Sequence, residues 1–271
     1  MKVMIIFQYA SNKGDRAIAE YLISKLKETK DIDITLSTTL PELWKNLNEV
    51  KVIPMGSKKV TPVFKNEFLN KVSNRINIKI YKKFLYTDMI SPGSKCNRCR
   101  KVSKEFVEEI ENSDLVIVTG GHHITSIRNK NALYFITYDI GLAAKFAKRF
   151  VLWSQTIGPV DFTCEKAKRF FNDVFNKAER IYIRDENSKK CLEQFTGIED
   201  QKVVKTYDSV FGFGDMDILD FDERENKIGV SIFNGLSKAF DTYPDLAKML
   251  DYYADKGFEI EFFRMEENKK E

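Results

Sequence analysis

Residues 3–36 read VMIIFQYASNKGDRAIAEYLISKLKETKDIDITL, and this stretch decides the fold class. Val3 to Gln8 is a short apolar run that predicts a buried strand, and a polar turn around Gly14 follows it. Apolar residues then recur at helical spacing from Ala17 to Leu26, and Ile32 to Leu36 alternates in the manner of a second strand. Strand, helix and strand in this order predict a βαβ unit and therefore a parallel sheet.

The same alternation returns in the second hundred residues. A Gly-Gly turn at Gly120 and Gly121 is expected after one of these strands. The predicted helices are 103–111, 132–148, 164–178 and 188–195, and the predicted strands are 114–119, 150–155, 180–184 and 203–206. We therefore expect an α/β protein with a Rossmann-like parallel sheet flanked by helices.

Two segments interrupt this rhythm. Residues 50–101 contain scattered lysines and prolines, one amphipathic piece at 64–72 and one strand-like run at 76–80, so we expect an insertion there. Residues 214–226 are acidic and weakly periodic, which is typical of a linker. The expected organisation is an N-terminal α/β domain over 1–213, the linker, and the start of a C-terminal α/β domain over 227–271.

The C-terminal domain is expected to be incomplete. Its pattern is one strand at 227–233, one helix at 245–256 and one strand at 259–265. A single βαβ unit of about 45 residues is too small to support a core of its own. We therefore expect a fragment or a shortened protein, unless these elements dock on the first sheet or a partner chain supplies the rest.

Composition excludes several classes of protein. The chain is 43% hydrophobic, which is enough for a sizeable core, and its net charge of +4 is too balanced for a dedicated nucleic-acid binder. No apolar run approaches the ~20 residues of a membrane span, and the N-terminus enters a strand pattern without a secretory signal. These features predict a soluble cytoplasmic protein that keeps its cysteines reduced.

Cys96 and Cys99 form a lone C-x-x-C pair. A tetrahedral zinc site needs two further ligands, but Cys164 and Cys191 fall in helical patterns and the only histidines are His122 and His123. We therefore expect no metal and a reduced thiol pair.

The candidate site residues follow the ends of five predicted strands. In open parallel sheets, ligands bind beyond the carboxyl ends of the strands, where helix N-termini present free N–H groups. We therefore expect these residues to line one site. They are Asn12, Gly14, Asp15, Gly120, Gly121, His122, Gln155, Gly158, Arg184 and Asp208.

Simpler roles are open for several of them. Asp15 could only cap the helix that follows, and Gly120-Gly121 could only allow a sharp backbone turn, although paired glycines also let an anion approach main-chain N–H groups. His122 and His123 could be surface or core-edge residues. An arginine at the end of a buried strand needs an anion or an acidic partner, so Arg184 is expected to bind either a ligand anion or a carboxylate such as Asp185 or Glu186.

The residues alone contain no nucleophile elbow, Walker loop or G-x-G-x-x-G motif. However, several short motifs occur in a characteristic order: N-K-G-D-x-A at 12–17, Gly120-Gly121, S-Q-T-I-G-P at 154–159, I-R-D-E-N-S at 183–188, Y-D-S-V-F at 207–211 and K-I-G-V-S-I at 227–232. In this order and spacing the chain resembles the polysaccharide pyruvyl transferase family over nearly its whole length.

The resemblance implies a GT-B-like two-domain fold and a cytoplasmic transferase of exopolysaccharide biosynthesis. The donor substrate would be phosphoenolpyruvate, with no further cofactor, and the acceptor would be a sugar or a lipid-linked glycan. By position, Asn12, Gly14 and Asp15 would line one side of the cleft, Arg184 would face the donor's anionic groups, and Asp208 would lie near the domain junction. Gly121, His122, Gln155 and Gly158 would border the cleft or form its floor.

The chemistry requires a general acid, a base for the acceptor hydroxyl and cations for the donor. Asp15 or Asp208 could serve as that base. The chain departs from the family at His122-His123, where relatives carry a small residue, and it lacks the Arg-x-His-type motif of the family's second domain. Whether a homo-oligomer completes the cleft stays open.

Two other functions are compatible with the same patterns. A GT-B nucleotide-sugar glycosyltransferase shares the architecture, because a fold does not fix a function. A catalytically idle domain that binds a glycan or a partner protein could use exposed aromatic residues of the insertion, such as Tyr81, Phe84 and Tyr86.

Overall fold

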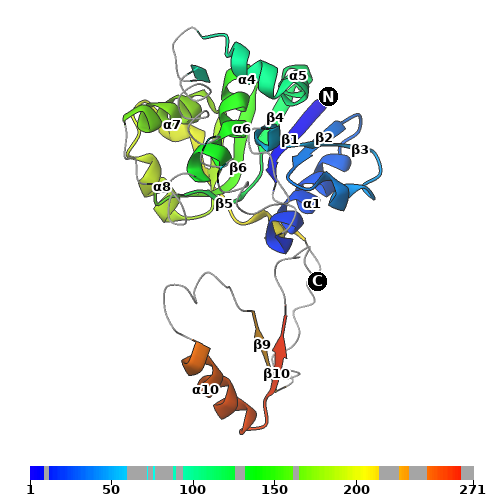
Figure 1. Ribbon diagram of the computed structural model, residues 1–271, viewed down its shortest axis with the longest axis vertical. Helices are drawn as coiled ribbons and strands as arrows, with labels where there is room; N and C mark the ends of the chain where they lie inside the picture. The colour runs from blue at the N-terminus through cyan, green and yellow to red at the C-terminus, as the bar shows by residue number, and fades with distance from the viewer. Residues whose placement is uncertain are drawn as a thin grey trace. The chain divides into compact units, whose positions relative to one another are not determined.

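The computed structural model describes residues 1–8, 12–59, 72, 76, 88–89, 94–125, 132–160, 165–213, 226–231 and 243–263. The chain forms two compact units (Figure 1). The first comprises Met1–Ala10 and Asp15–Gly212, and the second comprises Ser11–Gly14 and Phe213–Glu271. Of the predicted linker at 214–226, only Asn226 lies within the described residues.

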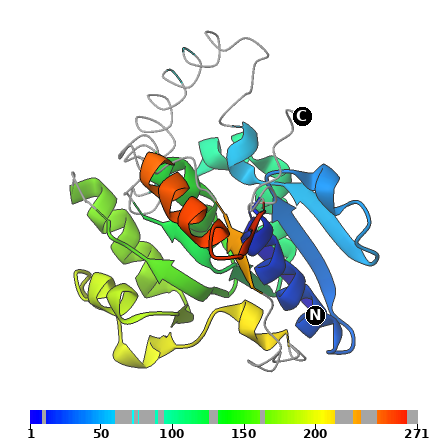
Figure 2. The same cartoon turned by 90° about the horizontal axis from the view of Figure 1, so that it is seen from below.

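The first unit is built on one parallel sheet in the order β3-β2-β1-β4-β6-β7-β8, with β5 paired to β6. Figures 1 and 2 show the blue strand β3 at one end of this row of strands, and β8 ends the other side of the order. The predicted parallel sheet is thereby confirmed. The strands are β1 (Lys2–Gln8), β2 (Asp33–Thr38), β3 (Val50–Pro54), β4 (Leu115–Val118), β5 (Gly121–Ile124), β6 (Phe150–Ile157), β7 (Arg180–Ile183) and β8 (Val203–Lys205).

Helices cover both faces of this sheet. The side chains of β1 point alternately to the two faces, and both sets are buried. Met4 and Ile6 pack into the core beneath α5, α6, α7 and α8, whereas Val3 and Ile5 pack against α1 on the opposite face. A strand buried on both sides must be apolar throughout, which explains the continuous apolar run. The helices are α1 (Lys13–Lys27), α4 (Asn97–Val102), α5 (Lys104–Asn112), α6 (Ala132–Phe146), α7 (Glu165–Lys177) and α8 (Glu186–Leu192). None of the described helices is long and apolar enough to cross a bilayer.

The strand order reverses between β1 and β4. The chain first builds outward through β2 and β3, and then returns to the other side of β1 to build β4 and the strands after it. Loops that leave two such neighbouring strands diverge, and the carboxyl edge between them is where open α/β sheets bind ligands. The first turn of α1 follows β1 at this edge, and the Gly120-Gly121 segment follows β4.

The predicted Gly-Gly turn is wrong. Residues 121–124 form β5, which continues along β6 in nearly the register of β4: Val118 is opposite Leu152, and Gly121 is opposite Gln155. The glycines therefore sit at a break within one extended path, not in a turn that leads directly into a helix. The backbone passes close to β6 at this break, and that approach requires small residues.

The predicted insertion also differs from the structure at both ends. Residues 50–54 form β3, which pairs in parallel with β2 and is the edge strand of the main sheet, and residues 97–102 form α4. Of the two pieces expected between them, only Val72 and Ile76 lie within the described residues, and both are helical. Residues 76–80 alternate between isoleucine and polar residues, which predicts a strand, but Ile76 is helical, so this local pattern did not decide the structure there.

Between residues 226 and 263, the described part of the second unit is a single βαβ element (Figure 1). β9 (Lys227–Val230) and β10 (Glu259–Phe262) pair in parallel, and α10 (Tyr243–Ala254) lies between them in sequence. Its core is sparse: Leu250 is buried, whereas Phe262 and Phe263 are more than half exposed.

Candidate functional site

The first group at the carboxyl edge is an Asp-His pair at the point where the strand order reverses. His123 in β5 places Nε2 3.2 Å from Oδ1 of Asp15, which lies in the first turn of α1, and both side chains are largely buried. The separation is an ion-pair distance, and no hydrogen bond joins these two atoms. An imidazole beside a carboxylate can accept and return a proton, because the carboxylate stabilises its protonated form.

The sequence analysis did not choose His123 as a site residue. The register of β5 is irregular between Gly121 and Ile124, so strict alternation does not decide where the two histidines point. In the structure Ile124 packs into the core, and His123 meets Asp15. The sequence pattern alone did not predict this contact.

Close contacts leave no room for a side chain at either of the two glycines that precede His122 and His123. A Cβ on Gly120 would lie 2.5 Å from the carbonyl oxygen of Ser154. Gly121 has φ +138°, a region almost closed to other residues, and a Cβ there would lie 2.2 Å from Nε2 of His123. Gly121 begins β5, so these glycines do not open directly into a helix N-terminus that could receive an anion.

His122 and Gly158, both predicted site residues, lie together. Nε2 of the exposed His122 ring is 2.6 Å from the carbonyl oxygen of Gly158, and because a carbonyl only accepts, this nitrogen carries a proton. Gly158 has φ +94°, and a Cβ there would crowd Sγ of Cys191 at 2.8 Å. This hydrogen bond ties the segment after β4 to the end of β6.

The side-chain nitrogen of Gln155 bonds to the backbone, while its Oε1 has no hydrogen-bond partner among the described residues. Its side chain is fully buried, and Nε2 donates to the carbonyl oxygens of Val118, at 3.1 Å, and Thr119. These carbonyls lie at the break between β4 and β5, where ladder bonding is interrupted. Gln155 thus supplies hydrogen bonds that a buried chain break requires.

Arg184 forms the second group, at the ends of β6, β7 and β8. Its guanidinium makes an ion pair with Oδ2 of Asp208, and it donates to Oγ1 of Thr156 from Nε at 3.1 Å and from Nη2 at 2.8 Å. Two predicted site residues are therefore in direct contact, and Thr156 is a member of the group that the sequence analysis did not select. Both charged side chains are mostly buried, so each offsets the cost of burying the other.

The acidic neighbours of Arg184 have other partners. Asp185 caps α8 by accepting from the N–H of Ser188 at 2.8 Å, and it also accepts from Thr156 at 3.0 Å. Burial alone would raise the pKa of Asp185, but the hydrogen bonds from Ser188 and Thr156 outweigh it and hold that pKa below its ordinary value. Glu186 pairs with Lys205 at 2.5 Å. Of the two partners expected for Arg184, neither is its ion-pair partner in the structure.

The remaining predicted residues, Asn12 and Gly14, lie at the start of α1. Oδ1 of Asn12 accepts from the N–H of Gly14 at 2.8 Å. This bond satisfies one of the N–H groups that a helix leaves unpaired at its beginning, so Asn12 acts as a helix cap.

Sheet geometry separates the two groups in the first unit. His123 lies in β5, which pairs with β6, and Arg184 follows β7 on the other side of β6, so two strand spacings, roughly 10 Å, separate the two backbones. A ligand that contacts both groups would have to reach across β6.

Comparisons with known proteins support a GT-B-like fold. The chain is similar to the structure of UDP-GlcNAc 2-epimerase from Methanocaldococcus jannaschii, with a TM-score of 0.51 and 10% sequence identity. The match covers 97% of this chain but 65% of that one, so the chain spans just under two thirds of the epimerase's length. At this identity the likeness shows the fold alone. A search of curated proteins found no match.

The family comparison covers residues 12–270, where the chain matches the model described as polysaccharide pyruvyl transferase. This range contains every motif on which the resemblance was based, and it includes Asp15, His123, Arg184 and Asp208. The chain belongs to the polysaccharide pyruvyl transferase family.

Proposed function

We propose that this protein transfers a pyruvyl group from phosphoenolpyruvate to sugar hydroxyls of a surface glycan, forming a ketal. Family membership supports the reaction class. The observation that carries the proposal is the pairing of His123 with Asp15 where the strand order reverses, because the reaction needs a group that moves protons at the ligand-binding edge of the sheet.

The proposed reaction proceeds by addition and elimination. A proton adds to the methylene carbon of phosphoenolpyruvate, and C2 becomes a cationic centre that a sugar hydroxyl attacks. Phosphate then leaves C2, a second hydroxyl of the same sugar takes its place, and the ketal is complete. The two hydroxyl protons are balanced by the new methyl hydrogen and by the released phosphate.

His123 is the proposed base for the attacking hydroxyl. The imidazole of His123 would accept a proton from a sugar hydroxyl, and the carboxylate of Asp15, 3.2 Å from Nε2, would stabilise the imidazolium that forms. Asp15, which we expected to be a candidate base itself, becomes the residue that positions His123. Asp208 is less suited to act as the base, since its carboxylate is already paired with Arg184.

Arg184 is the proposed ligand of the donor's carboxylate or phosphate. A guanidinium has five N–H donors, and three of them are used in the described contacts with Asp208 and Thr156. The other two would suit an oxyanion, and Asp208 would hold the planar fork in place for it. The sugar would then bridge from the Arg184 end of the edge towards His123.

The test is phosphate release from phosphoenolpyruvate that depends on a sugar acceptor, such as a β-galactoside, with the ketal product identified by mass. Changing His123 to Ala should lower kcat by about 10²- to 10⁴-fold, the usual contribution of a general base. Asp15→Asn should also lower kcat and alter the pH profile. Asp173→Asn, which changes a surface carboxylate that pairs with Lys177 on α7, should leave turnover unchanged.

Full turnover by the His123→Ala variant would exclude His123 as the base while leaving the reaction class intact. Turnover of a UDP or GDP sugar in place of phosphoenolpyruvate would instead overturn the pyruvyl-transfer proposal.

A further inference from the structure

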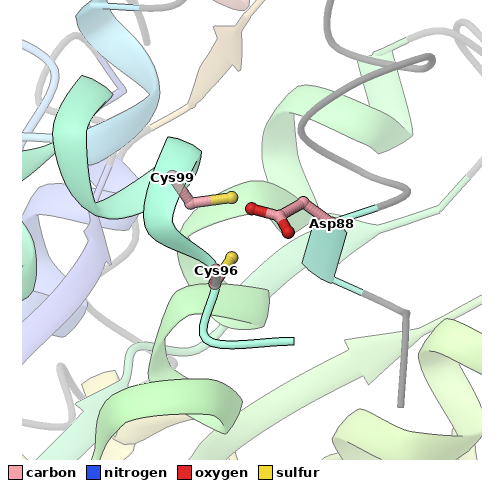
Figure 3. Close-up of side chains that lie close together, drawn as sticks. All are labelled: Asp88, Cys96 and Cys99. Atoms are coloured by element: carbon pink, nitrogen blue, oxygen red, sulfur yellow. The ribbon is translucent and has the colours of Figure 1, made fainter. Parts of the chain in front are cut away.

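A second chemical cluster lies apart from the Asp-His pair and the Arg184 group. It consists of Asp88, Cys96 and Cys99, and one ligand atom from each lies within 4.8 Å of the other two. Figure 3 shows both sulfur atoms and the carboxylate directed toward a common point. No further His, Cys, Asp or Glu in the described ranges of the chain joins this group.

The two sulfurs are brought together by the start of α4. Cys96 is the residue immediately before this helix, and Cys99 is in its first turn, so the three-residue spacing puts both side chains on one side. Cys96 has φ +51° and ψ +39°, a left-handed conformation that is uncommon for a residue with a side chain. Both cysteines are fully buried, and both are free thiols.

The carboxylate is held in place by its own hydrogen bonds. The hydroxyl of Ser94 donates to Oδ1 of Asp88 at 2.5 Å, and the same Ser94 oxygen accepts from the N–H of Cys96 at 3.0 Å. The N–H of Arg98 approaches Oδ2 at 3.4 Å. One serine therefore connects the carboxylate to the backbone of the first cysteine, which is the arrangement of an outer shell that orients metal ligands.

This composition is unusual for a structural core and usual for a metal site. The carboxylate is partly buried and lies against two buried sulfurs, where a bound cation would stabilise its charge. A thiol pair that exchanges disulfides must be accessible to its partner, and complete burial of both cysteines argues against that use. A tetrahedral zinc ion places thiolate and carboxylate ligand atoms roughly 3.5 to 3.8 Å apart, so the cluster needs only to contract slightly.

We propose that Asp88, Cys96 and Cys99 bind a zinc ion, with a water molecule as the fourth ligand. Two thiolates select a soft or borderline metal over magnesium or calcium, and a tetrahedral sulfur-oxygen set suits Zn²⁺. The ion would fasten Asp88 to the start of α4, beside the core that α5 and α6 cover. The expectation of no metal rested on counting cysteines and histidines alone, and Asp88 is the ligand that this count left out.

The test uses the full chain, purified under reducing conditions without chelator. We expect one equivalent of zinc per chain, and cobalt substitution should produce a thiolate-to-cobalt charge-transfer band in the near ultraviolet. Cys96→Ser and Asp88→Asn should remove or greatly weaken binding. Ser94→Ala leaves all three ligands in place and should lower zinc affinity by about 10- to 100-fold.

Cys191→Ser is the matched control, because Cys191 is a buried free thiol that is not a member of the cluster, and this variant should still bind one equivalent. A folded wild-type chain with four titratable thiols that binds neither zinc nor cobalt would overturn the proposal. A Cys96–Cys99 disulfide in the purified protein, or a cobalt spectrum that is the same in the wild type and in Asp88→Asn, would also overturn it.

Discussion

At the scale of single residues, Gly121 is where the backbone geometry and the candidate site meet. Its φ of +138° excludes most side chains, and the space that a Cβ would need is occupied by the ring of His123. The glycine is therefore required for the approach of His123 to Asp15, and not only for a change in chain direction.

Gly121→Ala should destabilise the protein by about 2–3 kcal/mol or more, because it adds a steric clash to the conformational strain. Gly197→Ala is the matched comparison. Gly197 also has a positive φ, +81°, but its nearest obstacle is the amide end of Asn176 at 3.2 Å, so strain of about 1 kcal/mol should dominate there. Denaturant unfolding measures both changes. Equal losses for the two variants would contradict the crowding argument.

At the scale of elements, a buried carboxylate joins α6 to η2 (Gly56–Lys59). Oδ1 of Asp139 accepts from the N–H of Ser57 at 2.8 Å, while its Oδ2 has no hydrogen-bond partner among the described residues. Burial raises the pKa of Asp139 to about 7, against the opposing effect of the hydrogen bonds from Ser57 and Gly56. The folded protein therefore favours the neutral, protonated form of Asp139.

This preference makes stability depend on pH. Between the ordinary aspartate pKa of about 4 and the folded pKa of about 7, the native state binds more protons than the unfolded state, so the free energy of unfolding falls as pH rises. Asp139→Asn imitates the neutral acid and should lack this loss. Relative to wild type, it should gain on the order of 4 kcal/mol between pH 4 and pH 7. Asp173→Asn should show no such gain in unfolding experiments. If the free energy of unfolding depended on pH in the same way in wild type and Asp139→Asn, the raised pKa of Asp139 would be refuted.

The elements that could be predicted from sequence are those with a complete periodic pattern. β1, α1 and β6 have one, because each is buried along one stripe or on both faces. β3, Val-Lys-Val-Ile-Pro, was not predicted, because it is short, ends in a proline and opens a stretch of scattered lysines and prolines. The site was predicted only in part. The polar residues at the strand ends could be identified, but the pairing of His123 with Asp15 depends on β5, whose sequence Gly-His-His-Ile has no strand-like composition.

Side-chain partners were harder to predict than strands. Arg184 was expected to need an anion or an acidic neighbour, and the structure gives it Asp208 from the end of the adjacent strand β8 in place of Asp185 or Glu186. Sequence neighbours are favoured by proximity along the chain, but a parallel sheet brings together residues that follow different strands. Asp185 was unavailable because a helix that starts after it needs a cap.

At the scale of the whole molecule, the two units should differ in stability. In the first unit, β1 lies inside a sheet that is covered on both faces, and Val3 to Ile6 are almost completely inaccessible. In the described part of the second unit, two paired strands and one helix bury little apolar area, and no residue of β9 or β10 is fully buried. Such a small assembly is expected to open more easily than a large core.

Amide hydrogen exchange on the intact chain tests this difference. Amides of Ile5 and Ile117 should exchange only when the first unit unfolds, whereas those of Ile228 and Ile260 should exchange at least about 100-fold faster through local opening. Mild denaturant should accelerate the first pair strongly and the second pair weakly, because global unfolding exposes more surface than local opening does. If both pairs shared one rate and one denaturant dependence, β9 and β10 would belong to the same cooperative unit as the main sheet, and their sparse core would not be what sets their stability.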